Sequence, residues 1–109
     1  MTITCVEFKP LRKGALHGFA ILEIQPTGLR IKDCTVMQSH GRRWIGLPGK
    51  PQITPEKTVR VVDGKAQYVN ILEWTSRERS VAFEEAALAA VLARYPHVFD
   101  DDADGGEAA

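Results

Sequence analysis

The chain has 109 residues, of which 44% are hydrophobic and 26% charged, and its formal net charge at pH 7 is zero. This length and composition predict one ordinary globular domain. No apolar run approaches the ~20 residues that a transmembrane helix needs, and the N-terminus lacks the basic and apolar regions of a signal peptide. We therefore expect a cytoplasmic protein that does not contact a membrane.

The first half of the chain predicts a series of strands. They are expected at 2–9, 18–25, 29–38 and 43–47, because these segments are rich in β-branched and aromatic residues. Pro10 is expected to end the first strand, and 11–17 to form a polar turn. The apolar phase of the third strand changes around Asp33 and Cys34, which predicts a β-bulge there. The segment 39–42 predicts a tight hairpin connection.

The second half predicts a hairpin and one helix. Strands are expected at 58–62 and 66–72, joined by the two-residue turn Asp63–Gly64. The residue pattern over 76–95 predicts a helix, with Thr75 as its N-cap and Glu78 completing a capping box. Its large apolar stripe is expected to comprise Val81, Leu88, Val91, Leu92 and Tyr95.

A second face of this helix carries mostly small residues. Because a small-residue face lets another helix approach closely, we expect a homodimer with Ala86, Ala87 and Ala90 at its interface. The alternative is that alanine occurs here only as a good helix former.

The order of these elements predicts an α+β fold, an antiparallel meander of about five to six strands with one C-terminal helix packed on it. This single domain is expected to span 1–99. The segment 100–109 is acidic and glycine-rich and predicts a disordered tail. Five of the 14 acidic residues lie in this tail, so the rest of the chain has an excess of five basic residues. Such asymmetry favours an anionic partner such as nucleic acid.

The residues with reactive side chains predict no catalysis. Cys5 and Cys34 are expected to be reduced thiols that act as small apolar residues on strands. The histidines His17, His40 and His97 form no ligand cluster, so no metal site is expected. The chain also lacks a nucleotide-binding glycine motif and a local motif for nucleophilic catalysis. We expect a non-enzymatic protein without a cofactor or a small-molecule substrate.

The segment 42–50 (RRWIGLPGK) combines cationic side chains, an aromatic ring and two glycines. Arginine and lysine neutralise phosphates, and an aromatic ring can stack on a base. The candidate nucleic-acid-binding residues are Arg42, Arg43, Trp44, Lys50, Lys57, Arg60 and Lys65. The alternative is that Trp44 packs in the sheet core and the two arginines belong to a solvated turn.

Three segments of the chain resemble the SpoVG (stage V sporulation protein G) family of small bacterial regulators. They are 3–8 (ITCVEF), 31–37 (IKDCTVM) and 44–50 (WIGLPGK), in which Pro48 and Lys50 fall on matching positions of the family pattern and Gly49 replaces a serine. The resemblance implies a sheet-plus-helix fold, a dimer, and regulation of gene expression by binding DNA or RNA without catalysis.

A second functional class stays open. The same fold could act as a protein–protein interaction module, or as a phage- or plasmid-associated accessory protein, without binding nucleic acid. Its binding surface would then be a sheet edge or the alanine-rich helix face.

Overall fold

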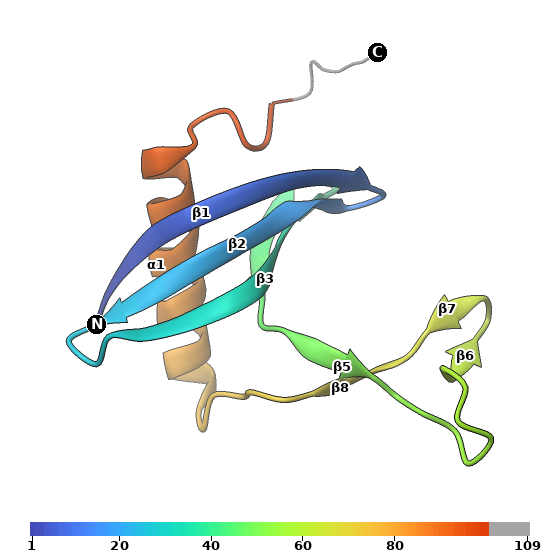
Figure 1. Ribbon diagram of the computed structural model, residues 1–109. Helices are drawn as coiled ribbons and strands as arrows, with labels where there is room; N and C mark the ends of the chain where they lie inside the picture. The colour runs from blue at the N-terminus through green and yellow to red at the C-terminus, as the bar shows by residue number, and fades with distance from the viewer. Residues whose placement is uncertain (101–109) are drawn as a thin grey trace.

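The computed structural model describes residues 1–100. Its main sheet has four antiparallel strands in chain order (Figure 1). They are β1 (Thr2–Lys13), β2 (Leu16–Gln25), β3 (Leu29–Ser39) and β4 (Arg42–Gly46). One helix, α1 (Arg77–Arg94), packs on one face of this sheet. The predicted α+β class is confirmed. Asp100 is the only residue of the predicted disordered tail that lies within the described part of the chain.

The remaining strands form two separate pairs and do not extend the main sheet. β5 (Gly49–Pro51) pairs with β8 (Tyr68–Asn70), and β6 (Val61–Val62) pairs with β7 (Lys65–Ala66). The second pair turns at Asp63–Gly64, as predicted, with φ angles of 52° and 77°. Together these strands and their connections form an arm, residues 49–72, that projects from the sheet (Figure 1).

The first strand continues past the predicted stop at Pro10. β1 extends to Lys13, Pro10 pairs with Gly18, and the connection to β2 is only the two residues between Lys13 and Leu16. The predicted polar turn over 11–17 is therefore wrong. Pro10 has no backbone N–H to donate. It is tolerated because β1 lies at an edge of the sheet, so that one of its two sides has no neighbouring strand.

The predicted bulge in β3 is confirmed. Asp33 has a φ angle of 60°, and the pairing with β2 shifts between the Cys34–Ala20 and Ile31–Leu22 partners. The additional residue returns the apolar side chains to a single face, so that Ile31, Cys34 and Val36 are all buried. Both cysteines of the chain are free and buried in this core.

The helix begins one residue later than predicted. Ser76, not Thr75, is the N-cap, and its hydroxyl accepts a hydrogen bond from the Arg79 backbone N–H at 3.2 Å. The buried stripe is Phe83, Ala87 and Val91, whereas Val81 of the predicted stripe is exposed. No helix among residues 1–100 is long and apolar enough to cross a membrane.

Candidate nucleic-acid interface

Arg42 and Trp44 lie together at the start of the edge strand β4. Their side chains are two residues apart on one strand, so they share a side of it, and the guanidinium carbon of Arg42 lies 4.9 Å from the centroid of the indole ring. Arg42 also approaches Glu84 of α1, with 3.9 Å between Nη2 and Oε1. Trp44 is half-buried and lies outside the core cluster, in which the neighbouring Ile45 takes part.

Arg43 is held by different partners. Its Nε donates a hydrogen bond of 2.7 Å to Oε1 of Gln38, the residue opposite it on β3. Its guanidinium carbon lies 4.6 Å from the centroid of the Phe99 ring. Phe99 is itself buried and makes an edge-on ring contact with His17. Both arginines therefore rest on aromatic rings, which restricts their conformations while their side chains stay accessible on the surface.

The other predicted basic residues lie on the arm. Lys50 is on β5, Lys57 and Arg60 are in the segment between β5 and β6, and Lys65 is on β7. These four side chains, here called the arm group, are exposed and form no ion pair with another residue of 1–100. The arm projects from the main sheet (Figure 1), so the arm group lies on a different part of the fold from the edge group, which consists of Arg42, Arg43 and Trp44 on β4.

The structure buries part of the small-residue face of α1 in the core of its own chain. Ala87 has no exposed surface and belongs to the core of its own chain, and Ala90 is partly buried against the same core. The dimer interface predicted at Ala86, Ala87 and Ala90 is therefore wrong at Ala87. The small side chain instead lets the helix approach its own sheet closely.

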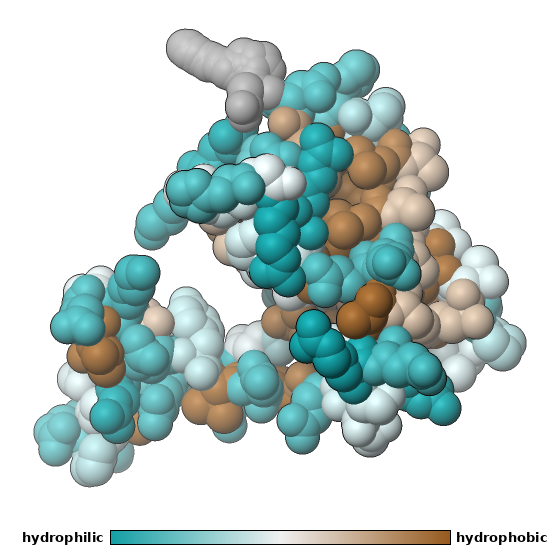
Figure 2. All heavy atoms as spheres, turned by 180° about the vertical axis from the view of Figure 1, so that it is seen from behind, coloured by the Kyte–Doolittle hydropathy of each residue, from teal (hydrophilic) through white to brown (hydrophobic). Residues whose placement is uncertain are grey.

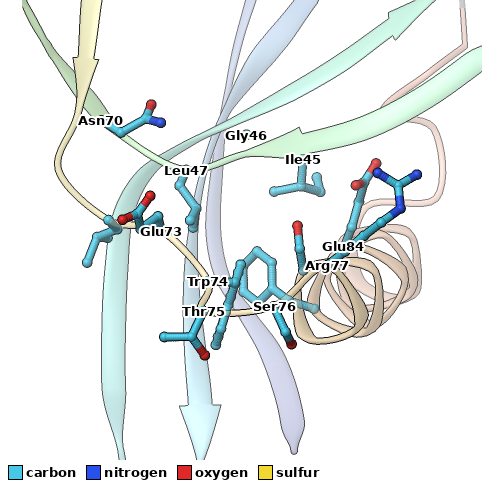
Figure 3. A pocket seen from close by; sticks show the side chains of 13 residues that line it. Ile45, Gly46, Leu47, Asn70, Glu73, Trp74, Thr75, Ser76, Arg77 and Glu84 are labelled. Carbon is cyan, nitrogen blue, oxygen red and sulfur yellow. The ribbon is translucent and has the colours of Figure 1, made fainter.

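Sequence reasoning missed a hollow of about 630 Å³ where the arm rejoins the body (Figure 3). Its apolar side includes Ile45 and Leu47 at the end of β4, with Trp74 and Phe83, whose ring centroids are 5.2 Å apart. Among residues 1–100, the indole Nε1 of Trp74 is the only fully buried side-chain nitrogen or oxygen without a hydrogen-bond partner. The hollow thus has an aromatic wall. It depends on the return path of the arm, which no local motif indicated.

A second groove, of about 640 Å³, lies between the arm and the sheet face that α1 leaves uncovered. We call it the outer groove. Its apolar residues are Leu16, Phe19, Met37, Leu47, Pro48 and Tyr68. Leu16, Phe19 and Met37 are half-buried, whereas Tyr68 on the arm is 65% exposed. The groove arises because β5 and β8 leave the plane of the main sheet, so it could not be expected from a single continuous meander.

No protein-family model, curated protein or solved structure matches the chain.

Proposed function

We propose that the protein is a non-catalytic, homodimeric regulator that binds DNA or RNA in the cytoplasm. The observation that carries this proposal is the edge group, in which two consecutive arginines at a sheet edge each lie over an aromatic ring. Guanidinium groups are well suited to phosphates because their planar donors match phosphate oxygens. Restricting the side chains beforehand lowers the entropy lost when they bind.

The surroundings of the edge group agree with this role. The Arg42–Glu84 contact is long, at 3.9 Å, and the arginine side chain is 72% exposed. The long contact and the exposed arginine make this pair weak, so a phosphate can take the place of the carboxylate. The exposed arm group adds further cationic side chains without carboxylate partners among the described residues.

The family resemblance supports the same proposal. Its three segments fall on β1, β3 and the stretch from β4 into β5, and the last of these contains Trp44 and Lys50. The segments 31–37 and 44–50 lie on neighbouring strands, and residues 35–37 of the first pair with residues 44–46 of the second.

Fluorescence polarisation with labelled single-stranded DNA, double-stranded DNA and RNA tests the proposal. The parent should bind at least one of them, with an affinity that falls steeply as salt rises. An Arg42→Ala/Arg43→Ala variant should bind about tenfold or more weakly, and the slope of log affinity against log salt should fall by about one to two, because up to two phosphate contacts are lost.

A matched control removes the same charge elsewhere. Lys32→Ala/Arg79→Ala deletes two exposed basic side chains outside both groups and should leave the salt slope nearly unchanged. If the parent fails to bind any of the three nucleic acids at low salt, the proposed function is refuted. If the edge-group variant binds as tightly as this control, the edge group is not the site.

A protein-interaction module is the second candidate, and the exposed apolar side chains of the arm favour it. Affinity capture from nuclease-treated extract separates the two classes. A stoichiometric partner protein, together with no binding in the polarisation assay, would establish the module in place of the nucleic-acid function.

A further inference from the structure

The arm exposes an unusual share of the molecule's apolar surface. Eight of the twelve exposed large hydrophobic residues found among 1–100 lie on it. They are Ile53, Val59, Val61, Val62, Tyr68, Val69, Ile71 and Leu72. Figure 2 shows the corresponding hydrophobic atoms along the arm, away from the body of the molecule. Single exposed apolar residues are normal, but a concentration of them indicates a surface that another molecule covers.

Among residues 1–100, neither the main sheet nor α1 covers the arm extensively. The extensive contacts of β5 and β6 are with β8 and β7, and not with the main sheet or α1. The radius of gyration is 15.2 Å, compared with ~13 Å for a compact domain of this length. The two ends of the arm line the outer groove through Gly49, Tyr68 and Asn70, and the rest of the arm leads away from the sheet (Figure 1).

The outer groove has the complementary character. It is open and predominantly apolar, and it lies in the angle between the sheet and the arm. Each chain therefore has both an apolar projection and an apolar recess that its own projection does not occupy. Two such chains related by a twofold axis, the commonest symmetry of protein dimers, can each cover the apolar arm of the other with their own outer groove.

We propose that the arm of one copy packs into the outer groove of a second copy, and the second arm into the groove of the first. This deepens the proposed function, since it rests on the homodimer named there and identifies its interface. It also places the arm group of one copy against the body of its partner, so that the cationic surface of each half contains residues of both chains.

The size and charge of these surfaces fit a second copy of the chain. Full burial removes roughly 60–120 Å² of apolar surface for each large aliphatic side chain. About half of that is exposed on each of the seven aliphatic arm residues, so they offer on the order of 300 Å² per copy, to which the apolar residues that line the outer groove add their own surface. A standard interface buries ~800 Å² per partner, somewhat more than half of it apolar. The charges are compatible as well, because the arm carries the four exposed basic side chains of the arm group and the outer groove includes the carboxylate of Asp33.

Sedimentation velocity of the full chain, without nucleic acid and over a range of concentrations, tests the proposal. The parent should sediment as a dimer of the 12.1 kDa chain. Val69→Glu/Ile71→Glu introduces charge at two arm residues that are 41% and 60% exposed. This variant should dimerise more than about 100-fold more weakly, because carboxylates would be buried without partners.

The matched control, Leu29→Glu/Val81→Glu, changes residues of similar exposure, 53% and 43%, that do not line the outer groove. It should dimerise like the parent. A parent that is monomeric at every concentration overturns the inference, and so does an arm variant that dimerises as tightly as the control.

Hydrogen exchange on the parent keeps the test decisive if the arm variant does not fold. Protection of backbone amides at 49–72 should rise with protein concentration, and protection that does not change overturns the inference. Both experiments omit nucleic acid, so a failed interface is distinguishable from a failed nucleic-acid function. Loss of nucleic-acid binding with an intact dimer would refute only the latter.

Discussion

Asp33 shows how one residue can decide which face a strand buries. Its φ angle of 60° is one that aspartate tolerates better than most side chains, and the bulge it forms brings Ile31 and Cys34 to the same buried face. This feature was predictable because the apolar phase of the sequence changes at that point. The half-buried position of Trp44 was not predictable, because the sequence does not tell which of the adjacent apolar residues Trp44 and Ile45 faces the core.

The two thiols lie in the same core, and burial alters both of them. Burial raises the pKa of Cys5 above its ordinary value, and raises the pKa of Cys34 to about 12, with smaller contributions to the latter from Asp33 and Cys5. Since the thiolate is the reactive form, neither cysteine should react with a thiol reagent at pH 8 unless the protein unfolds. Rapid labelling of the native protein would contradict this prediction.

The same pKa shifts make stability depend on alkaline pH. An unfolded thiol loses its proton near pH 9.0, whereas folded Cys34 keeps its proton until pH is about 12. The folded state therefore binds more protons in this interval, and the free energy of unfolding should fall as pH rises from 9 to 12. Cys34→Ala should show a shallower decline in urea titrations over this range, and an unchanged slope would refute the assignment.

Among the elements, the helix was easy to predict and its first residue was not. The periodic apolar residues and Pro96 define a helix over most of the observed range, Arg77–Arg94. Thr75 and Ser76 are both good N-cap residues, and the choice between them depends on where the helix docks against the sheet. Local sequence does not contain that information, and helix ends are uncertain by one or two residues for the same reason.

Substitution of the two neighbours tests the assignment of the cap. Ser76→Ala should lower the free energy of unfolding by about 1 kcal/mol, because the Arg79 N–H loses its acceptor. Thr75→Ala should change it by less than about 0.5 kcal/mol, since Thr75 is exposed. Urea denaturation followed by circular dichroism measures both values. The reverse order of effects would mean that Thr75 is the cap.

The late strands were predicted as strands but placed in the wrong sheet. The turn at Asp63–Gly64 was recognisable because its residues favour the positive φ angles that it adopts. Whether a hairpin joins the main sheet depends on long-range pairing, which periodicity does not report. The basic residues of the candidate site were therefore identified by type, while their division into an edge group and an arm group needed the three-dimensional structure.

At the scale of the whole molecule, the body and the arm differ in what stabilises them. The body has a shared core formed by the sheet and α1, whereas the arm is held by short strand pairs, local hydrogen bonds and the contacts that we propose with a second copy. Local stability follows such differences in burial.

Hydrogen exchange under native conditions should therefore show two levels of protection. The paired amides of β2 and β3, the central strands, should exchange only through global unfolding, and those of β5 to β8 should exchange through smaller openings. The dependence of the exchange rates on urea distinguishes global unfolding from smaller openings. A small opening exposes little surface, so its free energy changes only weakly with urea concentration. Equal protection and equal urea dependence in body and arm would contradict this picture.

The hollow beside Trp74 has a consequence for how such proteins can diversify. It is lined both by residues at the end of β4 and by residues just before α1, so the chain leaves the body and returns to it at adjacent points. Doubling the length of an intervening loop costs only about 0.6 kcal/mol in closure entropy. The arm can therefore grow or shrink by insertion and deletion while the core is kept, and in an arm-exchanged pair its length would act as a spacer that sets the separation of the two bodies.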